Sequence, residues 1–324
     1  MLKSSKRSPE SEGMSYEAMS FDDVKAKVNL NYARKITAPP EYENFYAGVC
    51  DVIEPKVALA LAADLREYRK NPDRKIMIGV MTHPIMLDPE SFPEEVFREV
   101  SREFPLREQM AAAFTDDPDV LNTLHYADLY GPEGRQWEAG ASPNVLENLE
   151  LCVEYGGENL HAIQLDVTWP EPSAIKAFKE KYPDILIILQ VGKFAMDAVA
   201  NDPQKMVDLL REYDGSVDFV LLDMSMGKGK SIGTGSDVLL RQLNLIQYEL
   251  PGLGLAIAGG FGPGSMDSLK PIADEFPDIA IDAQGRLKAD HAPRDGKGHF
   301  IGTVQADLDR ASEYIRQSCD LLDN

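Results

Sequence analysis

Eight short apolar segments alternate with helical stretches along the chain, and this alternation predicts a closed parallel (β/α)8 barrel over residues 41–324. Several of the apolar segments are continuous runs of Val, Ile and Leu, which is typical of parallel strands buried on both faces. The chain has 324 residues, 44% of them hydrophobic, which is enough for one large core. Barrels of this class often exceed roughly 200 residues as a single domain.

The first 40 residues are predicted to form an extension outside the barrel. Residues 1–20 are polar and aperiodic, a composition typical of disordered tails. Residues 21–34 have apolar side chains at a four-residue spacing, which favours a short helix, and Pro39-Pro40 would end it. We expect this extension to pack on the outside or the bottom of the barrel, or on a partner subunit.

The predicted elements follow in order. The strands are 45–51, 75–81, 121–127, 160–167, 184–191, 217–223, 254–259 and 278–283. The helices are 55–70, 143–156, 171–181, 203–213, 235–248, 264–275 and 304–319, with a helical spacer over 89–120. Pro55 is well placed in the first turn of the first helix. An open doubly wound sheet is the main alternative, but no GxGxxG motif follows the first strand, which weakens its dinucleotide-binding form.

Composition limits the classes of ligand. Lys and Arg total 33 against 54 Asp and Glu, and the resulting net charge of −21 repels nucleic-acid phosphates and anionic lipids. No apolar run approaches the length of a membrane span, and no signal peptide is recognised. Cys50, Cys152 and Cys319 are too few and too scattered for a disulfide framework. We therefore expect a cytoplasmic protein that binds neither nucleic acid nor membranes, and the sequence leaves a homo-oligomer open.

Two glycine-containing loops, after the seventh and eighth strands, predict a phosphate-binding site. The seventh strand ends in Gly259-Gly260, and a turn with Gly262 leads into the next predicted helix. Glycines let the backbone approach a ligand, and a helix start supplies unpaired N–H groups. Gly285 and the cation Arg286 follow the eighth strand. Phosphate sites of barrels often form from these two loops. The alternative is that the glycines only make tight turns.

The same third of the chain carries three motifs in barrel order. The sixth strand ends in Leu-Leu-Asp at Asp223, and a loop with Lys228 and Lys230 follows. The seventh strand ends in Ala-Gly-Gly over residues 258–260, and the eighth carries Asp282 and reaches a glycine. Together these motifs resemble phosphoribosylanthranilate isomerase, the barrel enzyme of tryptophan biosynthesis.

A weaker similarity at the front of the chain places Cys50 on the family's strand-one cysteine and Gln164 in its strand-four motif. The family's reaction is an Amadori rearrangement, in which an acid protonates the ring oxygen of an aminoribose and a base removes the proton from C2′. The resemblance implies Asp223 as the acid and Cys50 as the base. It also implies a small phosphorylated substrate and no metal or organic cofactor.

Polar residues near the predicted strand ends are further candidates for substrate contact. They are His83, Gln164, Lys228, Lys230 and Asp282. A carboxyl beside a dry core, as expected for Asp223, can have a raised pKa, and a cysteine becomes a thiolate where cations lie near. The spacing of His83, His125 and His161 matches no metal signature, so no metal site is predicted.

The chain also departs from this family. Asp51 replaces the glycine after the cysteine and places a negative charge beside the sulfur. The loop after the second strand lacks the arginine that the family uses for the substrate carboxylate. Asp166 stands where the family has histidine, and Ala283-Gln284 stands where it has serines. Two alternatives therefore stay open: another phosphosugar-handling barrel enzyme, such as a lyase or aldolase, and a non-catalytic barrel that binds a phosphate-containing ligand.

Overall fold

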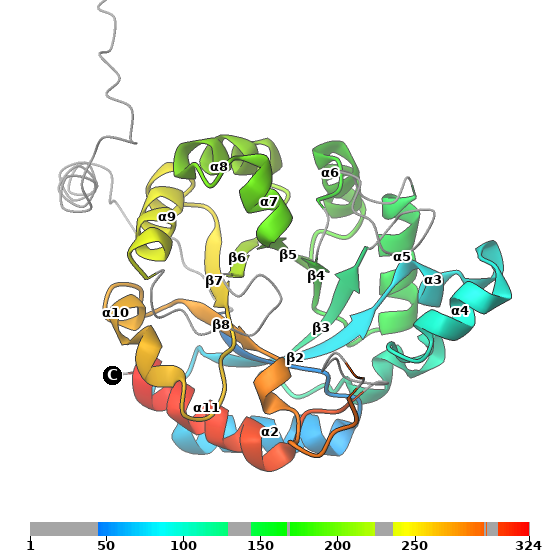
Figure 1. Cartoon of the computed structure of the whole chain (residues 1–324), viewed down its shortest axis with the longest axis horizontal. Helices are drawn as coiled ribbons and strands as arrows, with labels where there is room; N and C mark the ends of the chain where they lie inside the picture. The colour runs from blue at the N-terminus through cyan, green and yellow to red at the C-terminus, as the bar shows by residue number, and fades with distance from the viewer. Residues whose placement is uncertain are drawn as a thin grey trace, which may run out of the picture.

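Eight parallel strands close into one barrel in the chain order β1 to β8, with β8 paired to β1 (Figure 1). The computed structural model describes residues 45–128, 144–166, 169–223, 236–294, 296 and 304–323. The predicted (β/α)8 barrel is confirmed, and the open doubly wound sheet is excluded because the sheet has no free edge. The extension predicted over residues 1–40 lies outside the described residues.

The strands match the predicted apolar segments to within two residues at each end. They are β1 (Tyr46–Cys50), β2 (Lys75–Thr82), β3 (Val120–Ala127), β4 (Ala162–Asp166), β5 (Leu186–Val191), β6 (Phe219–Asp223), β7 (Gly254–Ala258) and β8 (Ala280–Ala283). Nearly every residue of these strands is buried. The continuous apolar runs are therefore explained by burial on both faces, against the helices outside and the barrel axis inside.

The helices surround the strands in Figure 1. The α-helices are α2 (Pro55–Tyr68), α3 (Pro84–Leu87), α4 (Glu94–Val100), α5 (Val145–Gly156), α6 (Pro172–Lys181), α7 (Lys193–Ala198), α8 (Pro203–Leu210), α9 (Ser236–Glu249), α10 (Lys270–Ala273) and α11 (Leu308–Leu322). Short 3-10 turns are η2 (Pro89–Ser91), η3 (Arg107–Ala113), η4 (Arg211–Tyr213), η5 (Met266–Leu269) and η6 (Gly285–Leu287). None of the helices in the described ranges is both long enough and apolar enough to cross a bilayer.

The predicted helix over 264–275 does not form as one helix. In place of a single helix over 264–275, the chain forms η5 and then the four-residue α10. Pro271 is the second residue of α10 and has no N–H group to donate to the preceding turn. The 3-10 turn and the α-helical turn therefore do not merge into one regular helix.

Helix α11 packs beside α2 and completes the outer layer next to β1 (Figure 1). Its buried residues recur every three or four positions, as expected for a helix with one face against a core: they are Ala311, Tyr314, Ile315, Ser318, Cys319 and Leu322. The three cysteines of the chain are free and buried, in agreement with the absence of a disulfide framework.

A buried ion pair fixes the end of α11 to the amino ends of the strands. The Arg74 guanidinium donates to the Asp323 carboxylate over 2.7 Å, and both side chains are fully buried. The guanidinium also donates to the carbonyl oxygens of Pro277 and Ile279 and lies 4.8 Å from the ring centroid of Phe45. Segments just before β1, β2 and β8 are thus joined to the C-terminal helix.

The barrel interior is apolar in its amino-terminal half. The side chains that fill it are Tyr46, Met77, Leu121, Ala162, Ile188, Phe219, Leu221, Ala256 and Ala280. Because side chains alternate along a strand, residues two or four positions further on also point inward, nearer the carboxyl ends. Most of those positions are polar or glycine, so polarity increases toward the end of the barrel where active sites of this fold form.

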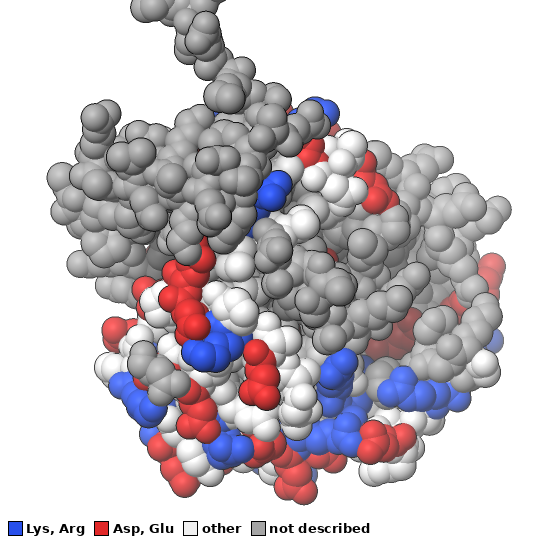
Figure 2. All heavy atoms as spheres, turned by 60° about the vertical axis from the view of Figure 1, so that its left-hand side comes forward, with Lys and Arg blue, Asp and Glu red and all other residues white. Residues whose placement is uncertain are grey.

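The outer surface that Figure 2 displays carries acidic and basic side chains side by side rather than one large patch of a single sign. Some exposed charges of the protein form ion pairs along helices, as Arg316 does with Glu313 and Asp320 on α11. Exposed pairs of this kind contribute little to stability, typically about 0–1 kcal/mol each.

Candidate functional site

Five polar side chains meet inside the carboxyl-terminal half of the barrel, and we call them the interior cluster. Its members are Cys50 on β1, His125 on β3, Gln164 and Asp166 on β4, and Asp282 on β8. Each lies two or four residues after a member of the apolar layer on the same strand, so the strand alternation directs it inward. All five are buried, the most exposed being Asp166 at 9%.

The thiol of Cys50 lies between a carboxylate and an imidazole. Its Sγ donates to Asp282 Oδ1 over 3.0 Å and is 3.7 and 3.8 Å from the two ring nitrogens of His125. Burial, followed by the negative charge of Asp282, raises the pKa of Cys50 well above its ordinary value. Cys50 is therefore a protonated thiol at neutral pH, and the thiolate expected beside cations is disfavoured in this environment.

His125 and the two carboxylates form the rest of the cluster. Burial alone lowers the pKa of His125, but Asp166, whose Oδ2 lies 3.7 Å from Nδ1, and then Asp282 outweigh it, so the pKa is raised overall. Burial also raises the pKa of Asp282. The Gln164 amide donates to Asp166 Oδ1 over 2.9 Å and lies 3.5 Å from Asp282 Oδ2, and so bridges the carboxylates. The cluster can therefore hold and transfer protons between a thiol, an imidazole and two carboxyl groups.

Two strand glycines give the cluster its space. A Cβ at Gly48 would lie 2.7 Å from Asp282 Oδ1, and a Cβ at Gly79 would lie 2.6 Å from His125 Nε2. Both distances are too short for any side chain, so glycine is required for Asp282 and His125 to occupy the interior. A glycine inside a strand often marks such a close approach, so Gly48 and Gly79 within two apolar runs already indicate one in the sequence.

The predicted acid, Asp223, lies at the same end of the barrel as the interior cluster. It ends β6, is half-buried and accepts a hydrogen bond of 3.2 Å from the Gln190 side chain. The strand register places Asp223 beside Ala258 and Ala258 beside Asp282, so the two carboxylates stand at one level, separated by a methyl side chain. The structure thus brings Asp223, Cys50, Gln164 and Asp282 to one end of the barrel.

Neighbouring side chains neutralise the negative charge of Asp51. Its carboxylate pairs with Lys288 Nζ at 2.8 Å and accepts a hydrogen bond of 3.0 Å from Gln284. Its backbone has φ +62°, a left-handed conformation that asparagine and aspartate tolerate better than most other residues after glycine. The negative charge beside the sulfur therefore ties the loop after β1 to the loop after β8.

The two predicted phosphate loops touch one another. A Cβ at Gly262 would lie 2.7 Å from Arg286 Cβ, so glycine permits the loops after β7 and β8 to pack together. Gly260 has φ +67°, a left-handed conformation that favours glycine, and Gly259 has φ +152°. Gly285 opens η6. Turn geometry and close packing account for much of this glycine content, and the phosphate site itself stays a prediction.

His83 has a structural position rather than one in the interior cluster. Its Nδ1 accepts a hydrogen bond of 3.2 Å from Ile85 N, which caps α3, and its ring packs against Phe104 at 5.5 Å between centroids. Burial lowers the pKa of His83 to about 4. Lys228 and Lys230 lie outside the described residues.

Two members of the interior cluster received no site role from the sequence. His125 carries no local motif, and Asp166, a polar residue at the end of a predicted strand, stands where the family has histidine. The signal that could have found both is strand parity: His125 follows the inward Leu121 by four residues, and Asp166 follows Ala162 by four.

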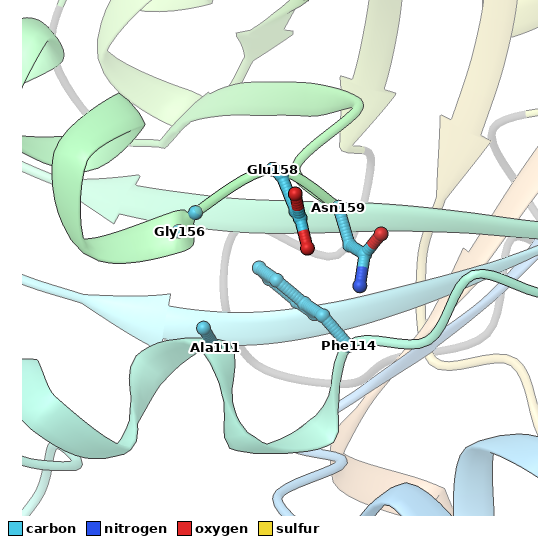
Figure 3. Close-up of a pocket in the computed structure, with 6 residues that line it drawn as sticks. Ala111, Phe114, Gly156, Glu158 and Asn159 are labelled. Atoms are coloured by element: carbon cyan, nitrogen blue, oxygen red, sulfur yellow. The ribbon is translucent and has the colours of Figure 1, made fainter.

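A surface hollow lies at the opposite end of the barrel. It is lined by Ala111, Phe114, Gly156, Gly157, Glu158 and Asn159. Figure 3 shows Phe114 from the segment before β3 facing Glu158 and Asn159 from the loop before β4. The hollow contains one ionisable side chain and lies at the amino ends of the strands, whereas barrel chemistry takes place at the carboxyl ends. The interior cluster is therefore the candidate functional site.

No protein family and no curated protein matches the sequence. Among solved structures, the chain is similar to the tryptophan synthase alpha chain from Legionella pneumophila, with a TM-score of 0.49, 10% identity, and coverage of 95% of this chain and 98% of that one. It is also similar to triosephosphate isomerase from Bartonella henselae, with a TM-score of 0.41, 10% identity, and coverage of 74% and 92%. The barrel assignment rests on the strand pairing itself, and function is inferred from the site.

Proposed function

We propose that this chain is a cytoplasmic enzyme that isomerises a phosphoribosyl compound by general acid–base catalysis, as phosphoribosylanthranilate isomerase does. The observation that carries the proposal is that Cys50 and Asp223 end their strands at the same end of the barrel as the touching loops after β7 and β8. One substrate can reach a base, an acid and a phosphate-binding segment only if all three lie at one end.

The proposed reaction starts with a proton from Asp223 to the ring oxygen, which breaks the bond from C1′ to that oxygen and leaves a protonated imine. Asp282 accepts the thiol proton of Cys50 over their 3.0 Å hydrogen bond, and the sulfur takes the proton from C2′. The resulting enolamine tautomerises to the ketone. Burial raises the pKa of Asp282, which makes it a stronger proton acceptor than an exposed carboxylate.

The phosphate of the substrate is placed at the loops after β7 and β8. The Arg286 guanidinium can form paired hydrogen bonds with phosphate oxygens, and backbone N–H groups near Gly260 and Gly262 supply further donors. The chain has no arginine in the loop after β2 for an aromatic carboxylate. The proposed contacts therefore hold the phosphoribosyl half of the substrate.

A different reaction on a phosphorylated sugar is the second candidate, and the pairing of His125 with Asp166 favours it. An imidazole held next to a carboxylate is a common proton-transfer pair, and it stands beside Cys50 as an additional acid–base couple. Identification of the products from a panel of phosphosugars separates the two candidates.

The first test is rescue of a tryptophan auxotroph that lacks the isomerase, with turnover of phosphoribosylanthranilate by purified protein as the direct measurement. Wild-type protein rescues growth, and Cys50→Ala or Asp223→Asn abolishes both rescue and turnover. Cys152→Ala is the matched control because Cys152 is a buried thiol on α5, outside the interior cluster. A well-expressed wild-type protein with neither rescue nor turnover refutes the assignment.

A further inference from the structure

Three members of the interior cluster are a soft sulfur, an imidazole nitrogen and a carboxylate oxygen that converge on one point. One ligand atom each from Cys50, His125 and Asp282 can be chosen so that all lie within 4.8 Å of one another, and all three residues are buried. They come from β1, β3 and β8, so the rigid barrel rather than a mobile loop holds them. Sulfur, nitrogen and oxygen together form a ligand set that Zn²⁺ accepts.

The distances suit a tetrahedral ion. Zinc binds cysteine sulfur at roughly 2.3 Å and histidine nitrogen at roughly 2.0–2.1 Å, so the two ligand atoms of one site lie about 3.5 Å apart. The Sγ of Cys50 is 3.8 Å from Nε2 of His125, the ring nitrogen that is not directed to Asp166. The 3.0 Å separation of Sγ and Asp282 Oδ1 is that of a hydrogen bond, and it lengthens by about half an ångström when an ion replaces the shared proton.

Two further observations point to a cation at this place. Neither Asp282 nor Asp166 forms an ion pair with a lysine or arginine of the described residues, although both carboxylates are buried. The Gln164 side chain donates to both of them, and its own carbonyl oxygen is buried with no hydrogen-bond partner in the described part of the chain. A buried acceptor beside two carboxylates costs free energy unless a cation or a donor satisfies it.

The remaining cluster members have the arrangement of an outer shell. Asp166 Oδ2 lies 3.7 Å from His125 Nδ1, and metal-binding histidines usually direct their second nitrogen to such a carboxylate. Gly48 and Gly79 leave the space into which Asp282 and His125 extend. The site therefore combines three ligands with a group that orients one of them.

We propose that Cys50, His125 and Asp282 bind one Zn²⁺ ion in the carboxyl-terminal half of the barrel. Binding replaces the thiol proton of Cys50 by the metal and releases that proton to solvent. Three protein ligands leave one tetrahedral position for a water molecule or a substrate oxygen. Zinc withdraws electron density from the bound sulfur, occupies the space beside it and engages Asp282, so the metal-bound form is inactive in the proposed isomerisation, and zinc acts on that reaction as an inhibitor.

The test uses the full chain, stripped of metal, with Co²⁺ as the probe. Cobalt bound to a thiolate gives a near-ultraviolet charge-transfer band, and Zn²⁺ then displaces the cobalt and removes the band. Wild-type protein develops the band with one equivalent of Co²⁺. Cys50→Ala abolishes it, Asp282→Asn weakens zinc binding by about 100-fold or more, and Asp166→Asn weakens it by about 10–100-fold.

Cys152→Ala is the matched control and keeps both the band and the zinc affinity, because Cys152 lies on α5. A folded wild-type protein without the band overturns the proposal, and so does a band that persists in Cys50→Ala. The binding measurement does not depend on the proposed isomerisation. Turnover by the metal-free protein without a cobalt band sinks only the metal site, whereas a band without any turnover sinks only the isomerase.

Discussion

The buried His83 makes the stability of the barrel depend on pH in a window that can be calculated. The folded protein holds its pKa at about 4, against 6.5 for an unperturbed histidine, because burial disfavours the charged ring. Above pH 6.5 the ring is neutral in both states and contributes no pH dependence. As the pH falls from 6.5 to about 4, the unfolded chain binds a proton that the folded chain does not, so the free energy of unfolding falls.

At about 1.4 kcal/mol per pH unit, the loss attributable to His83 between pH 7 and pH 5 is about 2 kcal/mol. The matched variant is His83→Asn, because asparagine is a favourable N-cap and its side-chain oxygen can accept the hydrogen bond from Ile85 N. Urea denaturation of both proteins at pH 7 and pH 5 gives four unfolding free energies.

Wild type is expected to lose about 2 kcal/mol more than the variant over this interval, since every other titrating group is common to both. The interval also stays above the sequence pI of about 4.6, which limits precipitation. Equal losses in the two proteins would refute the assignment of a low pKa to a buried, capping His83. An unfolding free energy that rises toward pH 5 only in wild type would contradict the sign of the effect.

Three further substitutions test how the barrel is held. Gly79→Ala places a methyl group against His125 and is expected to lower the free energy of unfolding by about 1–3 kcal/mol and to abolish cobalt binding. In the control Gly252→Ala the added methyl meets nothing within 4 Å, so urea denaturation and cobalt titration should find stability and cobalt binding unchanged. Arg74→Met leaves the buried Asp323 carboxylate without its ion pair and is expected to lower the free energy of unfolding, measured by urea denaturation, by about 3–5 kcal/mol. Adding Asp323→Asn should restore much of this stability, and no restoration would mean that the lost packing of Arg74 dominates. Asp51→Gly and Asp51→Ala lose the same ion pair, but only alanine is strained at φ +62°, so thermal denaturation should find the glycine variant more stable by about 1 kcal/mol, and equal stabilities would exclude the strain.

Local sequence patterns were sufficient for the strands but not for the contacts across the barrel. A buried parallel strand appears as a continuous apolar run, so the bounds of β5 or β6 could be predicted from the sequence to within two residues. The compensation of Asp51 by Lys288 depends on β8 closing against β1, which no local pattern reveals. Pro271 prevents one regular helix over 264–275, although a proline inside a helical pattern already indicates such a break in the sequence.

The candidate site was predicted in part for the same reason. Cys50, Gln164, Asp223 and Asp282 end or line strands, and their selection rested on the resemblance to phosphoribosylanthranilate isomerase as well as on position in a barrel. His125 required knowledge of which residues of β3 point inward. His83 resembled them in sequence position, but its ring turns back to cap α3. Strand parity counted from the apolar layer selects His125, but His83 has the same parity as the inward Met77, and only its place beyond the end of β2, as the N-cap of α3, removes it from the interior.

The ion pair between Arg74 and Asp323 also concerns the order in which the chain acquires its structure. It joins the segments before β1, β2 and β8 to the last described residue, so residues nearly 280 positions apart in sequence must be present together before the amino end of the barrel is complete. During synthesis, a nascent chain that has already made β1 to β7 still lacks both the closing strand and this anchor. The amino end of the barrel is therefore completed late, and a nascent chain that lacks β8 leaves the edges of β1 and β7 open to pairing with other chains.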